Sequence, residues 1–241
     1  MRIDVITLFP NMFAPLDDSI IKRARERNIL EINFIQLRDF AFDKHRQVDD
    51  SPFGGGAGMV LKPEPLFRAV RSVLETSLEP SRRRVLIMDP IGDVFNQSKA
   101  KELAEFEQLI FICGHYEGFD ARIYELADEA ISIGEYVLTG GELPAMVIID
   151  AVARMLPGVL GSEESARTDS FYEEDSGYPQ YTRPRDFEGR LVPEVLLNGN
   201  HAEIAKWRRE FGKKNRLLRA AHSVEKNQPA YSSSASLSAN F

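Results

Sequence analysis

The sequence is poor in cysteine and has no long apolar run. Cys113 is the single cysteine among 241 residues, which excludes an internal disulfide and a metal cluster held by several cysteines. No apolar stretch approaches the ~20 residues that cross a bilayer, and the N-terminus shows no signal-peptide pattern. We therefore expect a cytoplasmic protein that does not contact a membrane.

The familiar nucleotide-binding signatures are also missing. The glycine pair in "GEYVLTGGELPA" (residues 134–145) stands between a strand-like run and a helix, where a backbone can approach a ligand closely. No lysine followed by serine or threonine stands at P-loop spacing, and the glycine spacing is not that of a dinucleotide fold.

The bulk composition is that of a globular chain. Hydrophobic residues make up 43% and charged residues 28%, enough for one large domain or a larger and a smaller one. The net charge of -7 argues against indiscriminate binding of nucleic acid. A sum over the whole chain hides local patches, so the positions of the basic residues must decide.

Strand-like and helical patterns alternate along the first two thirds of the chain. This alternation predicts an α/β domain at 1–157 with a parallel sheet covered on both faces. We expect strands at 2–9, 31–37, 84–90, 108–113 and 129–134, and helices at 17–27, 63–76, after 96, after 120 and at 142–156. The polar, acidic segment 158–182 is typical of a linker or lid. A helical domain at 183–228 and a disordered serine-rich tail at 229–241 follow.

The helix at 142–156 has almost no polar face, which predicts a helix buried all round. Asp150 and Arg154 interrupt this pattern at a spacing of four. They can form an intrahelical ion pair. Alternatively, a charge on so apolar a helix faces a partner subunit or a bound anion, because an isolated buried charge is costly.

Three loops follow the ends of predicted strands: "MDPIG", "CGHYEG" and "SIGEYVLTGG". Ligands of open parallel sheets bind at the carboxyl ends of strands, so these loops can share one ligand. The loops are poor in lysine and arginine, which argues against a triphosphate. A further glycine cluster, "VDDSPFGGGAGMVLKPEP", is either a flexible connection or part of a site.

Several segments, in order, resemble the bacterial tRNA (guanine-N1)-methyltransferases, the TrmD type of the SPOUT class. They include "LFPNMF", "DKHRQVDDSPFGGGAGMVLKPEP", "CGHYEGFDAR", "SIGEYVLTGGELPAMVIIDAVARMLPGVLG", "YPQYTRP" and "VPEVLLNGNHAEIAKWR", and the resemblance spans about residues 1–210. It implies a deep trefoil knot in the C-terminal part of the α/β domain, against the strong general rule that chains are unknotted. It also implies a homodimer with active sites at the subunit interface, S-adenosylmethionine as methyl donor, and tRNA guanosine 37, next to the anticodon, as target.

The resemblance assigns the three loops to the cofactor. Backbone groups of 133–138 would bind the adenine, and the turn at Gly140 and Gly141 would let the cofactor pass closely. The implied cofactor-binding residues are Pro90, Gly114, Tyr116, Glu117, Gly118, Ile133, Gly134, Glu135, Tyr136, Val137, Leu138, Gly140, Gly141 and Pro144.

Methylation of guanine at N1 needs a base that removes the N1 proton and a cation near O6, where negative charge develops. The resemblance gives these roles to Asp169 and Arg154; by itself, Asp169 reads as one of many linker acids. Gly177 stands where the family usually has an acid, which affects how the linker orders over the substrate. No metal-ligand cluster is visible, so a magnesium requirement cannot be read from the sequence.

Basic residues gather in "KWRREFGKKNR", either as a solvated helix face or as a surface for tRNA phosphates. The net acidity elsewhere favours the RNA surface. From this cluster we expect Lys206, Arg208, Arg209, Lys213 and Lys214 to bind RNA, and Arg183 can add to them. The family resemblance adds His45, Arg46 and Asp50, in a segment that would meet the anticodon loop, and Ser165.

Two other functions remain open at this point. One is a SPOUT methyltransferase acting on a different RNA position or on a ribose hydroxyl. The other is a noncatalytic RNA-binding protein that keeps the fold. The presence of Arg154, Asp169 and the cofactor loops favours the enzyme.

Overall fold

The computed structural model describes residues 1–161, 171 and 177–226. The chain divides into two units, Met1–Ala166 and Arg167–Phe241, each of which is described by itself. The expected linker 158–182 lies largely outside the described residues, and the expected tail 229–241 lies entirely outside them.

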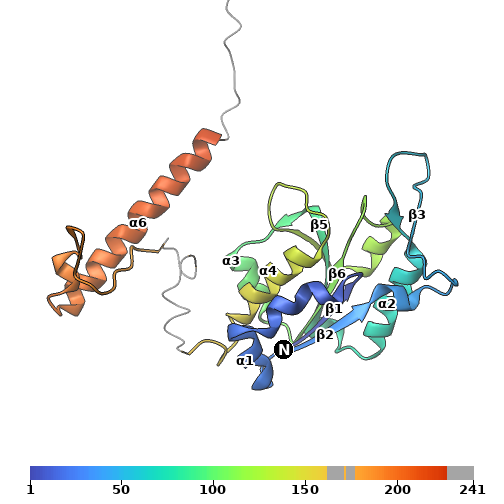
Figure 1. The fold of residues 1–241 in the computed structure, drawn as a ribbon, viewed down its shortest axis with the longest axis horizontal. Helices are drawn as coiled ribbons and strands as arrows, with labels where there is room; N and C mark the ends of the chain where they lie inside the picture. Colours follow the sequence, from blue (N-terminus) through green and yellow to red (C-terminus); the bar gives the residue numbers. More distant parts are fainter. Residues whose placement is uncertain (162–170, 172–176, 227–241) are drawn as a thin grey trace, which may run out of the picture. The chain divides into compact units, whose positions relative to one another are not determined.

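The first unit is built on one five-stranded parallel sheet (Figure 1). Its strands are β1 (Arg2–Thr7), β2 (Glu31–Gln36), β5 (Arg83–Val94), β6 (Gln108–Cys113) and β7 (Glu129–Ser132), in the order β2-β1-β6-β5-β7. Every residue of β6 is buried, as expected of a strand with neighbours on both edges and both faces. All four strand pairs are parallel, which confirms the predicted sheet.

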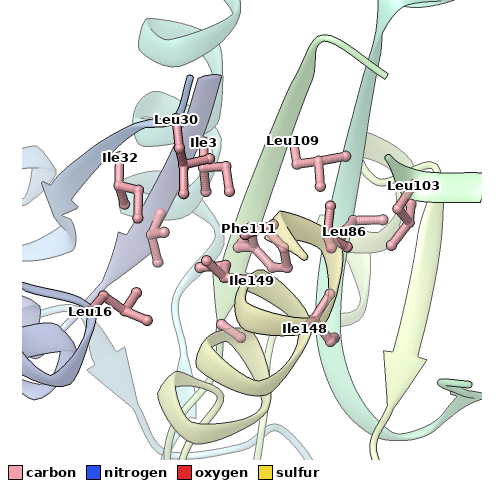
Figure 2. Packing of buried hydrophobic residues seen from close by; sticks show 14 of the residues in the cluster. Ile3, Leu16, Leu30, Ile32, Leu86, Leu103, Leu109, Phe111, Ile148 and Ile149 are labelled. Carbon is pink, nitrogen blue, oxygen red and sulfur yellow. The ribbon is translucent and has the colours of Figure 1, made fainter. Parts of the chain in front are cut away.

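Helices cover both faces of this sheet. Alternate residues of β6 point to opposite faces, so Leu109 and Phe111 belong to one apolar cluster and Ile110 and Ile112 to the other. The first cluster packs against α1 (Ser19–Glu26), α3 (Gln97–Leu103) and α4 (Glu142–Ala153), and the second against α2 (Pro63–Glu75). Figure 2 shows Ile148 and Ile149 of α4 close to Phe111 and Leu86. The prediction of a sheet covered on both faces is confirmed.

Short elements complete the first unit. They are the 3₁₀ helices η1 (Pro10–Asp17), η2 (Leu37–Phe40), η3 (Pro80–Arg82) and η4 (Ala121–Leu126), and the antiparallel pair β3 (Asp49–Asp50) and β4 (Val60–Leu61). The helix expected after residue 120 is therefore a short 3₁₀ helix. The β3–β4 pair frames the glycine cluster at 54–58, which the sequence left as a flexible connection or part of a site.

The prediction that the apolar helix is buried all round is wrong for α4 in a single chain. Leu143 and Val147 are about half exposed, and Asp150 is exposed as well. The opposite face, with Ile148, Ile149 and Val152, is fully buried against the sheet. The sequence pattern shows that the side chains of this helix are apolar. Within the described residues, however, only one face of the helix is covered.

The second unit contains the strand pair β8 (Asp186–Phe187) and β9 (Arg190–Leu191), the turn η5 (Glu194–Leu196) and the helix α6 (His201–Lys226). Trp207 on α6 packs against Phe211 and Tyr181, with ring centroids 4.5 and 6.4 Å away. The helix expected over "HAEIAKWRREFGKKNRLL" is confirmed and extends further along the chain. None of the helices in the described residues is long and apolar enough to span a membrane.

Candidate functional site

A cavity of about 430 Å³ opens at the carboxyl ends of β6 and β7 and at residues 88–91 of β5, where the register of β5 against β7 shifts. The loops at 88–91, 114–119 and 131–141 all line it, so the three loops singled out in the sequence do meet in one place. Of the expected cofactor residues, the cavity brings together Pro90, Gly114, Tyr116, Glu117, Gly118, Ile133, Gly134, Tyr136, Val137, Leu138, Gly140, Gly141 and Pro144.

Glu135 is the one residue of that set that does not line the cavity. The structure adds lining residues that the sequence did not single out: Met88, Asp89, Ile91, His115, Phe119, Tyr124, Ile131, Ser132 and Thr139. Most are neighbours in the same loops. Tyr124 comes from η4, and no local pattern indicates that it reaches this cavity.

Glycine is required where the loops cross. A Cβ atom on Gly141 would lie 2.8 Å from Cys113 Cα and 2.9 Å from the backbone nitrogen of Gly114. The Gly141 N–H donates a hydrogen bond to the Gly114 carbonyl at 2.9 Å, which fixes this close approach. Any larger residue would push the turn into the cavity or away from β6.

The cavity carries acidic but no lysine or arginine side chains among the described residues that line it. Asp89 accepts hydrogen bonds from the Ile91 N–H at 2.9 Å and from the Tyr124 hydroxyl. Burial and the Asp89 carboxylate together raise the pKa of Tyr124, so this hydroxyl stays protonated. Because the described lining residues offer no lysine or arginine to phosphate oxygens, the cavity suits a ligand that is neutral or positively charged.

A buried polar cluster lies beside the cavity. Glu142, the first residue of α4, is fully buried, and its carboxylate accepts a hydrogen bond from the Thr7 hydroxyl at 2.6 Å. The other carboxylate oxygen lies 2.7 Å from His115 Nε2. Burial, and then the Glu142 charge, raise the pKa of Cys113 well above its usual value, so this thiol stays protonated.

The two expected catalytic residues are not seen together. Arg154 is half-buried at the C-terminal end of α4, where its N–H donates to the Asp150 carbonyl at 3.2 Å. Asp169 lies outside the described residues, and so does Ser165 of the expected RNA-binding set.

The side chains of His45, Arg46 and Asp50 are exposed. The Arg46 guanidinium pairs with Asp39 at 3.0 Å, and one Asp50 oxygen accepts the Ser51 N–H at 2.7 Å.

The glycine cluster beyond this segment reaches the cavity loop. A Cβ on Gly58, whose φ is +83°, would lie 2.6 Å from the Glu117 side chain. The Glu117 N–H donates to the Met59 carbonyl at 3.0 Å. The cluster therefore borders the cavity, rather than serving only as a connection.

The expected basic residues of the second unit are exposed. They are Arg183, which precedes α6, and Lys206, Arg208, Arg209, Lys213 and Lys214 on the helix. Lys206 lies 4.0 Å from Glu210, and the Arg208 guanidinium stacks 4.9 Å over the Tyr178 ring. Most of this positive charge faces solvent.

The family follows from comparison with known proteins. The model of the family described as tRNA (Guanine-1)-methyltransferase TrmD matches residues 1–224. The chain is 60% identical over 212 residues to the tRNA (guanine-N(1)-)-methyltransferase of Moorella thermoacetica, covering 87% of this chain and 84% of the relative. It is 55% identical over 219 residues to the protein of the same name from Lacticaseibacillus paracasei, covering 91% and 85%. The resemblance seen in the motifs is confirmed: the chain belongs to the tRNA (guanine-1)-methyltransferase TrmD family.

Proposed function

We propose that this chain is a tRNA (guanine-N1)-methyltransferase that uses S-adenosylmethionine to methylate N1 of the guanosine at position 37, next to the anticodon. The observation that carries the proposal is the cavity beside β5, β6 and β7, whose described lining residues include no lysine or arginine, in a chain of this family. The curated relatives bear the name tRNA (guanine-N(1)-)-methyltransferase.

The residues of the cavity fit the cofactor. S-adenosylmethionine has no phosphate, and its sulfonium supplies the methyl group. A volume of about 430 Å³ is within the range of pockets for small cofactors. The backbone of 133–138 would hold the adenine, and the close turn at Gly140 and Gly141 would line the passage beside it. The carboxylates of Asp89 and Glu117 match a ligand with positive charge.

Two residues supply the chemistry on the guanine. N1 of guanine carries a proton at neutral pH, so Asp169 would accept that proton as a general base. Arg154 would lie near O6 and stabilise the negative charge that develops there as the proton leaves. The Asp169 carboxylate would reach N1 when tRNA binds, which would separate cofactor binding from proton transfer.

The tRNA would bind mainly through its phosphates to α6. Support comes from the exposed cations of that helix and from Arg183. Phosphate contacts position an RNA without reading its sequence. The exposed segment with His45, Arg46 and Asp50 would approach the anticodon loop, and Ser165 would add a contact from the linker.

We also infer a homodimer and a knotted first domain. Leu143 and Val147 on α4 and Val137 in the cavity loop are large apolar side chains exposed in the single chain, as at a subunit interface. Met88 and Asp93 of β5 both pair with Ile131, so the register of β5 against β7 shifts at residues 89–92, beside the loop that would thread the knot. The same proposal places the end of the first domain at 157 and the end of the linker at 182.

The test is nucleoside analysis. Unmodified tRNA is incubated with the chain and methyl-labelled S-adenosylmethionine, digested and separated. We expect the label in N1-methylguanosine. Label in another base or in a ribose would support a different SPOUT methyltransferase, and tRNA binding without any label would support the noncatalytic alternative.

A further inference from the structure

Glu142 is an acid in a position where acids are rare. It is fully buried at the start of α4. Burying a carboxylate is costly unless partners replace its water. Both of its oxygens have such partners: the Thr7 hydroxyl at 2.6 Å and His115 Nε2 at 2.7 Å. Among the described residues, His115 is the basic side chain within ion-pairing distance of Glu142.

Thr7 fixes one side of this cluster. It is fully buried at the carboxyl end of β1, and its oxygen accepts the Phe9 N–H at 2.9 Å while its proton goes to Glu142. The Phe9 ring contacts the His115 ring edge-on, with centroids 4.8 Å apart. The end of β1 therefore contacts both the acid and the imidazole.

His115 occupies the place where the two glycine loops meet. It forms a β-bridge with Gly140, and a Cβ atom on Gly140 would overlap both the imidazole and the Glu142 carboxylate. His115 lines the cavity, whereas Thr7 and Glu142 do not. The two buried residues thus reach a ligand in the cavity only through His115 and the loops.

We propose that Glu142 is a positioning residue for cofactor binding: with Thr7, it holds the His115 ring, and thereby fixes the loop at 114–118 against the turn at 140–141. A carboxylate that accepts an imidazole N–H sets both the tautomer and the orientation of the ring. This proposal rests on the proposed function, because it takes the ligand of the cavity to be S-adenosylmethionine.

A pair of substitutions at Thr7 separates hydrogen bonding from packing. Thr7→Val keeps the shape and removes the hydroxyl, whereas Thr7→Ser keeps the hydroxyl and removes a methyl group. Calorimetric titration with S-adenosylmethionine should show affinity about tenfold weaker for Thr7→Val, which loses the hydrogen bond to Glu142 together with the one from the Phe9 N–H, and close to parental for Thr7→Ser. Affinity for tRNA should be the same in all three proteins. The reverse order, with Thr7→Ser the weaker binder, would mean that Thr7 acts by packing and would overturn the proposal.

A spectroscopic measurement on the parental protein is independent of how the variants fold. In nitrogen-15 spectra of the histidine side chains, assigned with His115→Gln, the His115 ring should carry its proton on Nε2 in a slowly exchanging hydrogen bond. A His115 ring with Nε2 unprotonated would overturn the proposal, because Glu142 would then have no N–H to accept.

The outcomes distinguish this inference from the function on which it rests. If the parental chain does not bind S-adenosylmethionine, both fail. If the parental chain and both Thr7 variants bind it equally well, the inference fails and the proposed function stands.

Discussion

The cavity of the first unit and the basic face of α6 present very different side chains. The cavity is lined by glycine turns, apolar side chains and the acids Asp89 and Glu117, without a lysine or arginine among its described lining residues. The face of α6 presents Lys206, Arg208, Arg209, Lys213 and Lys214 to solvent. We infer that one region selects by shape and the other by charge.

This difference explains how a chain with a net charge of -7 can act on RNA. Attraction to phosphate requires a local positive surface, not a basic chain. It also makes the two regions separable by experiment. Larger side chains in the cavity should weaken cofactor binding, whereas added salt and charge reversal on α6 should weaken tRNA binding.

The largest effect is expected from filling the crossing of the cavity loops. Gly141→Val should abolish binding of S-adenosylmethionine, because its Cβ alone would lie 2.8 Å from the backbone of Cys113. Gly161→Val is the matched control: a Cβ atom on Gly161 would meet no atom of the described residues within 4 Å, and the variant should bind like the parental chain. Calorimetry gives both affinities. Unaltered affinity in Gly141→Val would mean that S-adenosylmethionine does not bind in this cavity.

A second substitution tests chemistry apart from either form of recognition. Asp169→Asn keeps the shape but cannot accept the N1 proton, so turnover should fall by at least ~10²-fold while cofactor and tRNA affinities stay close to parental. Glu173, another acid of the segment 158–182, supplies the control: Glu173→Gln should keep parental turnover. If the two variants behave the other way round, Glu173 is the base. Mixing Asp169→Asn with Gly141→Val should recover part of the activity if each site draws on both subunits.

The parts of the fold that could be predicted are those with local signals. The strand runs are rich in apolar and β-branched residues, and the glycine turns follow them directly, so the sequence alone indicates that the three cavity loops lie at one edge of the sheet. The two-residue strands β3 and β4 were missed because they are too short for a periodic pattern.

The missed features depend on distant parts of the chain. Tyr124 reaches Asp89 across 35 positions, and Thr7 reaches Glu142 across 135. Neither contact leaves a mark in the sequence near either residue. Leu143 and Val147 were expected to be buried, since apolarity shows what a side chain avoids but not which element covers it.

Reversing charge on α6 should have a moderate effect that depends on salt. Lys213→Glu combined with Lys214→Glu should weaken tRNA binding and flatten its dependence on log salt by roughly one unit of slope per lost phosphate contact. Cofactor affinity should not change. Lys22→Glu with Arg23→Glu, on exposed positions of α1, makes the same change in net charge and should keep the parental slope. If both double variants flatten the slope to the same extent, net charge rather than α6 determines RNA binding.

The smallest effect concerns a lysine whose charge serves the fold. Lys99 lies 2.9 Å from both Glu102 and Glu129, and these partners raise its pKa above the usual 10.5. Its contribution should be fully present below pH 10.5 and be lost as pH rises through the raised pKa. Lys99→Met should therefore lower the free energy of unfolding by up to about 1 kcal/mol at pH 7. The difference from the parental chain should shrink in strongly alkaline solution, as measured by denaturant unfolding at several pH values; a constant difference would assign the effect to packing.

The most direct test of the account uses two tRNA transcripts that differ in one nucleotide, with guanosine or adenosine at position 37. Each is incubated with the chain and labelled S-adenosylmethionine, and the label incorporated is measured and mapped. We expect stoichiometric label as N1-methylguanosine at position 37 of the first transcript and none in the second. Equal labelling of both transcripts would contradict the account, because the methyl group would then be going to another nucleotide.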